Sequence, residues 1–263
     1  MKTTITDSGF KSTLLGAGGN NSPSGVRGMI FAAGLGTRLK PFTDKHPKAL
    51  AIVNGKSLLQ RNVEYLQQHS ITDVIVNVHH FADQIIEIIN YNNGWGSNIS
   101  ISDEKDAILE TGGGLKRAAW YFEGVENFVV MNADILTDLD LSFMIKQHIN
   151  NKPLASLATT NRASSRYFLF DDNGYLCGWT NEKIGEERIS KPSSSMHKKA
   201  FSGIQIINQK LLPLITQVGK FSIVDVYLEI AKTHTIQGFD HSGSKFIDVG
   251  KPENIVLAES MFD

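Results

Sequence analysis

The sequence predicts an α/β fold, in which a mostly parallel sheet carries helices on both faces and a small antiparallel β insertion follows in the second half. Two observations support this prediction. In the first half, short apolar runs typical of buried strands alternate with segments of helical periodicity, which favours an open sheet covered by helices. Beyond residue 153 this alternation stops, and the sequence DDNG at residues 171–174 is a strong hairpin signal.

The first half is expected to form four strands and four helices. The run DVIVNV at residues 73–78 is almost continuously apolar, as expected for a strand buried on both faces of a parallel sheet. Ser57 can cap the helix that follows a short extended piece at residues 50–53. The strands are expected at residues 28–33, 73–78, 98–102 and 127–131, and the helices at residues 57–68, 83–90, 114–121 and 141–149.

The second half is expected to contain more strands than helices. Residues 183–199 are polar and typical of a loop, whereas Pro252 suits the first turn of a helix, where its missing N–H is not needed. Because no repeat or linker is visible, residues 28–263 are predicted to form a single domain. The expected strands are residues 153–160, 167–179 (interrupted by the turn), 200–208, 235–239 and 245–249, and the helices are residues 224–232 and a last one from 252.

The composition is ordinary for a globular protein, with 41% hydrophobic residues and a net charge of −1. A net charge this small predicts neither a nucleic-acid nor a membrane partner, and no apolar stretch approaches the roughly 18 residues of a membrane span. The single cysteine, Cys177, lies in an apolar strand and excludes an internal disulfide and a cysteine-cluster metal site. We therefore expect a cytoplasmic protein.

The first 27 residues differ from the rest because they are rich in Ser, Thr, Gly and Asn. Their apolar patch at residues 13–15 is too short for the core of a signal peptide. We expect residues 1–27 to be a disordered leader, an expression remnant or a misplaced start, with Met29 as the beginning of the domain.

Polar or small residues follow each of the expected parallel strands at the point where it ends. In open α/β sheets, ligands bind at the carboxyl ends of the strands. We therefore expect one edge of the sheet to bring together the loop at residues 34–48 and residues 77–80, 102–104 and 132–134.

The loop after the first strand is suited to phosphate groups. Gly34 and Gly36 let the backbone approach a ligand, and successive N–H groups in such a turn can bind anionic oxygens. Arg38 and Lys48 add positive charge. The loop is neither a dinucleotide fingerprint, which would need a third glycine at Leu39, nor a P-loop.

The whole run at residues 31–50 resembles the signature of the sugar-1-phosphate nucleotidyltransferases, (L/F)AAG-x-G-(T/S)-R-(L/M)-x-P-(L/F)-T-x-x-x-P-K-x-(L/M), and meets each fixed position. The resemblance implies a Rossmann-like fold of the nucleotide-diphospho-sugar transferase type. It also implies Mg²⁺-dependent transfer of a nucleotidyl group from an NTP to a sugar 1-phosphate, with release of pyrophosphate. These two substrates would be the partners of a monomer or homodimer.

Two aspartates are candidate Mg²⁺ ligands. Asp134 and Asp248 each follow an apolar strand, where a carboxylate can bind Mg²⁺ or simply cap a helix or face solvent. The resemblance favours the first role, because the family holds Mg²⁺ with aspartates from two such segments. It also gives Arg38 and Lys48 catalytic roles, in which Arg38 binds the β- and γ-phosphates and Lys48 the α-phosphate and sugar phosphate.

The resemblance also implies which residues bind the nucleotide and the sugar. Glu104 could accept hydrogen bonds from guanine or be a solvated carboxylate at a strand end, and the residues alone do not choose between these. The glycines at 112–114 are expected to open a helix and face the nucleotide. The expected nucleotide-binding residues are Ala32, Ala33, Gly34, Gly36, Thr37, Asn77, Glu104 and Gly112, and the expected sugar-binding residues are Asn132, Asn181 and Gly203.

The substrates are predicted less firmly than the reaction. The segments NVHHFADQI and LETGGG most resemble uridylyltransferases that act on N-acetylmuramate 1-phosphate, which predicts UTP and a role in cell-wall recycling. A guanylyltransferase acting on mannose or heptose 1-phosphate is the alternative. A non-catalytic nucleotide-sugar-binding module is an alternative of another class, which the joint presence of Arg38, Lys48, Asp134 and Asp248 disfavours.

Overall fold

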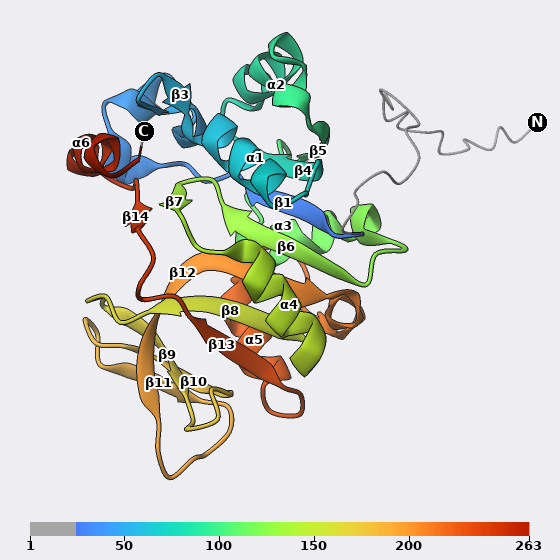
Figure 1. Ribbon diagram of the computed structural model, residues 1–263, viewed down its shortest axis with the longest axis vertical. Coiled ribbons are helices and arrows are strands. Elements are labelled where there is room, and N and C mark those ends of the chain that lie inside the picture. The colour runs from blue at the N-terminus through green and yellow to red at the C-terminus, as the bar shows by residue number, and fades with distance from the viewer. Residues whose placement is uncertain (1–24, 263) are drawn as a thin grey trace, which may run out of the picture.

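The computed structural model describes residues 25–262. The predicted leader therefore lies outside the described residues except at its end, where Arg27 already belongs to the first strand. One long sheet crosses the molecule from top to bottom in Figure 1. Its spatial order is β5 (Asn98–Asp103), β4 (Asp73–Val78), β1 (Arg27–Phe31), β6 (Asn127–Asn132), β12 (His197–Asn208), β8 (Ala155–Thr160) and β13 (Ile236–Asp240).

The strands on the amino-terminal side of this sheet are parallel, and β12 introduces the change of direction. Strands β5, β4, β1 and β6 pair in parallel, whereas β12 runs antiparallel to both β6 and β8. The hairpin predicted at residues 171–174 joins β9 (Arg166–Phe170) to β10 (Leu176–Asn181), which extend the sheet from β12. The expected fold class, a mostly parallel sheet with a small antiparallel insertion, is confirmed.

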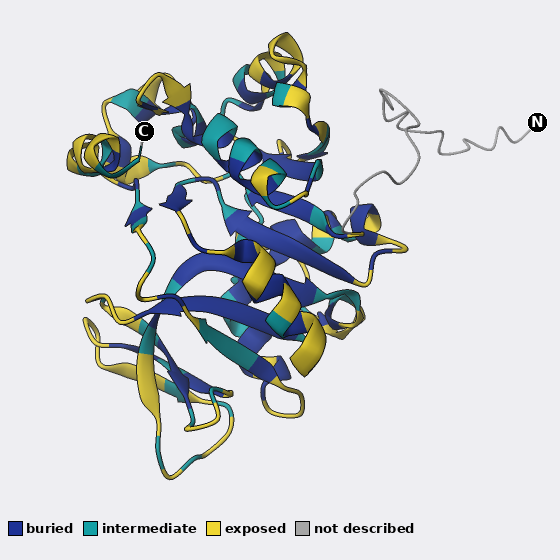
Figure 2. Ribbon diagram, viewed as in Figure 1, coloured by how far each residue is buried: buried dark blue, intermediate teal, exposed yellow. Residues whose placement is uncertain are grey.

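Helices cover both faces of the sheet. On one face α1 (Leu58–Gln68), α2 (Ala82–Tyr91) and α4 (Leu141–Asn151) bury their apolar sides against the strands. On the other face α3 (Glu110–Arg117) and α5 (Ile223–Ile230) form the second core layer. Figure 2 shows the central strands almost wholly buried. As expected, the Ser57 hydroxyl caps α1 by accepting a hydrogen bond from the Gln60 N–H.

A third, smaller core packs the loop at residues 34–48 against β14 (Phe246–Asp248) and α6 (Pro252–Met261) near the carboxyl terminus. It contains Leu39 of the loop, Leu136 of β7 (Ile135–Thr137), Ile247 of β14 and Ala258 of α6. Strands β7 and β14 pair antiparallel, and α6 begins at Pro252 as predicted. The remaining short elements are β2 (Ile52–Val53), β3 (Lys56–Ser57), and 3-10 helices at Thr37–Leu39, Phe42–Asp44, Lys48–Leu50, Asn93–Gly96, Ala119–Phe122 and Gln209–Leu214.

Two expected elements were wrong. The helix expected at residues 114–121 begins at Glu110, and its glycines lie inside it. Residues 183–199 are not a loop throughout, because β11 (Glu186–Ile189) pairs with β10 and β12 begins at His197. Strand β11 is an edge strand whose residues are mostly exposed, so it lacks the alternation of polar and apolar residues by which a half-buried strand is recognised.

Candidate active site

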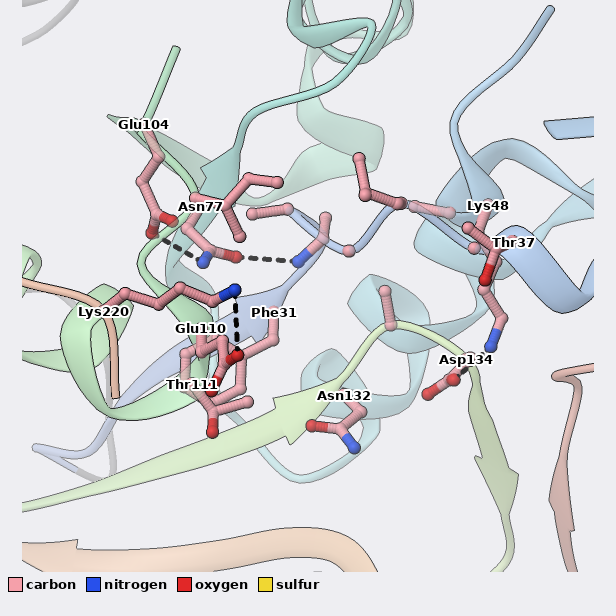
Figure 3. Close-up of a pocket in the computed structure, with 18 residues that line it drawn as sticks. Phe31, Thr37, Lys48, Asn77, Glu104, Glu110, Thr111, Asn132, Asp134 and Lys220 are labelled. Atoms are coloured by element: carbon pink, nitrogen blue, oxygen red, sulfur yellow. Dashed lines mark hydrogen bonds and ion pairs between the residues drawn. The ribbon is translucent and has the colours of Figure 1, made fainter. Parts of the chain in front are cut away.

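A cavity of about 560 Å³ opens at the carboxyl edge of the parallel strands. It brings together all four segments that were expected at this edge, namely the loop after β1 and the ends of β4, β5 and β6. Figure 3 shows the side chains that line it, with Glu104 and Lys220 toward one end and Lys48 and Asp134 toward the other. Each end of the cavity therefore carries both an acidic and a basic side chain.

The two glycines of the loop have different surroundings. A Cβ on Gly34 would meet no heavy atom of the described residues within 4 Å, so this backbone is open toward a ligand. Gly36 has a φ of 62°, and a Cβ there would lie 2.8 Å from Lys48 Cβ and 2.9 Å from Thr43 Cγ2. The Gly36 carbonyl also accepts the Thr43 hydroxyl at 3.0 Å. Gly36 thus shapes the loop, whereas Gly34 leaves space above it.

These surroundings predict opposite effects of two alanine substitutions. Gly36→Ala should lower the free energy of unfolding by about 1–3 kcal/mol, because it adds both backbone strain and a steric clash. Gly34→Ala should leave that free energy nearly unchanged but weaken NTP binding. Urea unfolding and nucleotide titration of both variants measure this. Equal loss of stability in the two variants would contradict the distinction.

Two carboxylates and two basic side chains form a cluster that begins at the Lys48 and Asp134 end of the cavity and extends beyond its lining. The Lys48 ammonium forms an ion pair with Asp134 and lies 3.8 Å from Asp248 Oδ1. The Arg38 guanidinium lies 3.7 Å from Asp248 Oδ2. Burial raises the pKa of the Asp248 carboxyl and the neighbouring Asp134 charge adds to this, while Lys48 and Arg38 oppose it. Two carboxylates placed this close therefore depend on positive charge between them.

Gly250 makes this arrangement possible. A Cβ at Gly250 would lie 2.6 Å from Asp248 Oδ1 and 2.7 Å from the Arg38 guanidinium. Its backbone thus gives the guanidinium room beside the carboxylate, a role that the sequence analysis did not identify. The pairing of β14 with β7 brings Asp248 opposite Ile135, directly beside Asp134 in the chain, and so unites the two acids across more than a hundred residues.

The donor set at Asp134 and Asp248 fits Mg²⁺. Asp248 Oδ1 is buried, and within residues 25–262 it has no hydrogen-bond partner. Carboxylate oxygens are the ligands that Mg²⁺ prefers, and Mg²⁺ keeps several waters, so two protein ligands suffice. The described residues hold no cluster of three His, Cys, Asp or Glu side chains, which a metal such as Zn²⁺ would require.

The opposite end of the cavity contains a buried carboxylate. Glu104 is 1% exposed, and its Oε1 accepts a hydrogen bond from Asn77 Nδ2 at 2.7 Å. Asn77 Oδ1 in turn accepts the Ala32 N–H at 2.7 Å, so a chain of hydrogen bonds joins β4 to the residue after β5 and to the residue after β1 (Figure 3). Glu104 Oε2 is buried without a hydrogen-bond partner in the described part of the chain. Burial raises the pKa of Glu104, against opposing effects of Asn77 and Arg117.

Gly112 and Gly113 of α3 allow close packing against other elements, whereas Gly114 lies against Glu104, where a Cβ would be 2.7 Å from Oε1. A Cβ at Gly112 would collide with the Phe221 ring, and one at Gly113 would collide with the Gly219 carbonyl. Gly112 does not line the cavity, so its expected contact with the nucleotide stays a prediction. Instead, Glu110 and Thr111 line it at the start of the helix, and Lys220 lies 3.3 Å from Glu110 across the mouth (Figure 3).

The three residues expected to bind the sugar are not equally close to the cavity. Asn132 lines it, and Gly203, with a φ of 72°, lies so near that a Cβ there would be 2.7 Å from Asn132 Nδ2. Asn181 is buried at the end of β10, outside the cavity lining, and its Oδ1 accepts the Lys183 N–H at 3.2 Å. The sugar-binding role of all three stays a prediction.

The other expected site residues fall into two groups. Ala32, Ala33, Gly34, Gly36, Thr37, Asn77, Glu104, Lys48 and Asp134 all line the cavity. Arg38 and Asp248 lie outside the cavity lining. Asp248 forms an acidic pair with Asp134 around the Lys48 ammonium, and Arg38 contacts Asp248. Sequence reasoning missed Lys220 and Ile108, which also line the cavity, because neither their residue types nor their spacing forms a recognisable motif. Glu110 lies in the segment LETGGG but was given no role of its own.

An α/β sheet with a glycine-containing loop at its carboxyl edge is an architecture that many proteins use to bind nucleotides by their phosphates. Comparison with known proteins makes this class more specific. The family model described as nucleotidyl transferase matches residues 27–260. The chain therefore belongs to the nucleotidyl transferase family.

Named relatives agree with this assignment. The N-acetylmuramate alpha-1-phosphate uridylyltransferase of Neisseria meningitidis serogroup B is 37% identical over 225 residues, which cover 86% of this chain and 93% of that relative. The mannose-1-phosphate guanyltransferase of Yarrowia lipolytica is 25% identical over 240 residues, which cover 90% of this chain and 64% of that relative. The crystal structure of HddC from Yersinia pseudotuberculosis complexed with GMP-PN superimposes with a TM-score of 0.72 at 25% identity, covering 90% of this chain and 100% of that one.

These comparisons confirm the expected enzyme class, a sugar-1-phosphate nucleotidyltransferase, and leave the particular substrates open. No helix in residues 25–262 is long and apolar enough to cross a membrane.

Proposed function

We propose that this enzyme transfers a uridylyl group from UTP to N-acetylmuramate 1-phosphate or a similar sugar 1-phosphate. The observation that carries the proposal is the placement of Lys48 and Arg38 of the glycine loop against Asp134 and Asp248 at one end of the cavity. This end has the charges that a transfer between two phosphates needs. The other end, with Glu104, is apart from these charges and suits the base (Figure 3).

The chemistry requires positioning rather than proton abstraction. An oxygen of the sugar phosphate, which is already anionic, attacks the α-phosphorus of the NTP, and pyrophosphate leaves with the electrons of the broken P–O bond. The main obstacle is the repulsion between anions that must be held in line. Lys48 would contact the α-phosphate and the incoming phosphate, and Arg38 would contact the β- and γ-phosphates and stabilise the leaving pyrophosphate.

Asp134 and Asp248 would hold a Mg²⁺ ion. When bound, the ion supplies positive charge that offsets the charge of the phosphates. The Lys48 ammonium lies between the two carboxylates in this structure, so it supports them before the ion binds. The backbone N–H groups of the loop, left open above Gly34, would complete the contacts to the phosphate oxygens.

The environment of Glu104 supports uracil. One carboxylate oxygen accepts from Asn77, and within residues 25–262 the other makes no hydrogen bond, which suits the single N3–H donor of uracil. Guanine presents two adjacent donors, N1–H and N2–H, and would compete with Asn77 for the first oxygen. The 37% identity to a uridylyltransferase over most of the chain favours the same base. Guanylyl transfer to mannose or heptose 1-phosphate remains the second candidate, supported by the likeness to the structure that contains GMP-PN.

Substitution of Glu104 distinguishes the two bases. Glutamine keeps an oxygen that can accept either from Asn77 or from a base N–H, while alanine keeps none. For uracil we expect Glu104→Gln and Glu104→Ala each to raise the KM for UTP by about tenfold, because the single oxygen of glutamine cannot accept from Asn77 and from N3–H together. A guanine site would lose about a hundredfold in its KM for GTP in both variants, because the charge that strengthens the hydrogen bonds to two donors is lost. Steady-state kinetics with UTP and GTP measures these changes.

The function itself is tested by pyrophosphate release. The full chain is incubated with Mg²⁺, each of UTP, GTP, CTP and dTTP, and a panel of sugar 1-phosphates that includes N-acetylmuramate 1-phosphate. Highest kcat/KM with UTP and N-acetylmuramate 1-phosphate is the expected result. Preference for GTP with mannose 1-phosphate would establish the second candidate. Nucleotide-sugar binding with no turnover on any pair would establish the non-catalytic module instead.

A further inference from the structure

Arg162 is a basic residue that belongs to no recognised motif, and its charge acts on Asp248. It lies at residues 161–165, between β8 and β9. Its Nη2 donates a hydrogen bond to the Phe201 carbonyl of β12 at 2.9 Å. Its guanidinium also lies over the Phe246 ring of β14, 5.2 Å from the ring centre. Two strands that are distant in sequence therefore fix one guanidinium.

The contact with Phe246 places Arg162 next to Asp248. Phe246 and Asp248 lie two positions apart on β14, and side chains two positions apart in a strand point to the same face. The positive charge of Arg162 accordingly lowers the pKa of Asp248, and the charge of Asp248 raises that of Arg162. Burial of the guanidinium is the stronger influence and lowers the pKa of Arg162, although the residue as a whole is exposed.

The contact with Phe201 places Arg162 next to the expected sugar side. Strand β12 pairs with β8 at Phe201 and again at Gln205, with a bulge between them. Gly203 lies in this bulge and packs against Asn132 of the cavity. Arg162 therefore contacts both the strand that carries Asp248 and the strand whose bulge borders Asn132.

The guanidinium has donors to spare. It carries five N–H donors in a planar fork that matches phosphate and carboxylate groups, and Phe201 takes one hydrogen bond. A second anion can therefore bind while Arg162 keeps its position. Arg38 and Lys48 belong to the loop that contacts the triphosphate in the proposed function. Arg162 instead belongs to the segment between β8 and β9 and is held by β12 and β14.

We propose that Arg162 binds an oxyanion of the sugar substrate. The oxyanion is either the 1-phosphate or a carboxylate carried by the sugar, such as the lactyl carboxylate of N-acetylmuramate 1-phosphate. This inference rests on the proposed function for the identity of the second substrate. It assigns Arg162 a substrate-binding role, with no direct part in the departure of pyrophosphate.

Two sugar phosphates that differ only in the lactyl group test the inference. Binding of N-acetylmuramate 1-phosphate and of N-acetylglucosamine 1-phosphate is measured by calorimetry for the wild type, Arg162→Ala and Arg162→Lys. Arg188→Ala is the matched control, because Arg188 pairs with Asp225 on the protein surface. Turnover is then measured with UTP and GTP on the same proteins.

We expect Arg162→Ala to weaken sugar-phosphate binding by about tenfold or more, because a charge-assisted contact is lost. Arg162→Lys should recover part of the affinity, and the KM for the NTP should not change. Weakening of both ligands identifies the phosphate as the partner, and weakening of N-acetylmuramate 1-phosphate alone identifies the carboxylate. Each result supports the inference.

Three outcomes would overturn it: affinities within about twofold of wild type, a loss confined to the NTP, or a wild type that binds neither sugar phosphate. A wild type that binds sugar phosphate but releases no pyrophosphate would refute the proposed function alone, because the effect of Arg162→Ala on binding would still be measurable.

Discussion

Replacement of Lys48 by methionine is expected to lower kcat/KM for nucleotidyl transfer by about 10²–10³-fold. The Lys48 side chain is only 13% exposed, and its ammonium pairs with Asp134 and lies 3.8 Å from Asp248. Methionine keeps a flexible, unbranched stem but carries no charge. The variant thus loses a cation that would contact the reacting phosphates, and its two carboxylates face each other without that cation.

The same variant should differ from wild type in its response to Mg²⁺. In the presence of a chelator we expect a lower melting temperature, because the charges of Asp134 and Asp248 repel each other more strongly. Added Mg²⁺ should then raise the melting temperature more than in wild type, since a ligand that binds the folded state stabilises it. Differential scanning fluorimetry over a Mg²⁺ titration measures both effects.

Lys40→Met is the matched control for Lys48→Met. Lys40 belongs to the same loop, but its side chain is 61% exposed and pairs with Asp44 at 2.9 Å. Exposed pairs of this kind contribute roughly 0–1 kcal/mol, so the control should keep the activity and the Mg²⁺ response of the wild type. Wild-type kcat/KM in Lys48→Met would show that this ammonium does not contact the reacting groups.

The part of the site closest to a local motif was predictable from sequence. Gly34, Gly36, Arg38 and Lys48 lie within fifteen residues, so their joint presence is visible before any fold is known. Asp134 follows the apolar run at residues 127–131, which predicts a buried strand. The carboxyl ends of parallel strands share one edge of the sheet. Local sequence and the rule for strand ends were together enough to locate the cavity.

Residues that depend on contacts between distant segments could not be found in this way. Arg162 lies near enough to Asp248 to affect its pKa only because it packs on Phe246 and donates a hydrogen bond to Phe201, and no pattern near residue 162 indicates either contact. Gly250 is similar, because its lack of a side chain matters only beside the Arg38 guanidinium. Such residues become apparent when the strands that carry their partners have been assembled.

The glycines of α3 show a different difficulty. Glycine permits close approach both of a ligand and of another element of the protein, and the sequence does not say which. The spacing at residues 112–114 predicts a segment that faces the nucleotide, and this contact stays a prediction. The structure shows a further role, because Gly112 and Gly113 let α3 pack against Phe221 and Gly219. The packing partner lies about a hundred residues away in the chain.

Replacement of Asp134 by asparagine is expected to lower turnover by about 10³-fold or more, because a metal ion in such a site contributes several kcal/mol of charge stabilisation. Asparagine has nearly the same shape and retains one oxygen. The Asp134 carbonyl accepts the Val249 N–H at 2.8 Å, a backbone contact that does not need the carboxylate. The fold should therefore persist, and circular dichroism and a cooperative melting transition check that it does.

The response to Mg²⁺ separates a metal ligand from a general negative charge. Asp134→Asn should abolish most of the Mg²⁺-dependent rise in melting temperature, whereas Lys48→Met should enlarge it, so the two variants are expected to move in opposite directions. Asp73→Asn is the control, because Asp73 begins β4 at the opposite end of that strand from the cavity. If Asp134→Asn keeps the Mg²⁺ response of the wild type while losing activity, Asp134 acts on the substrates or on Lys48 and does not hold the ion.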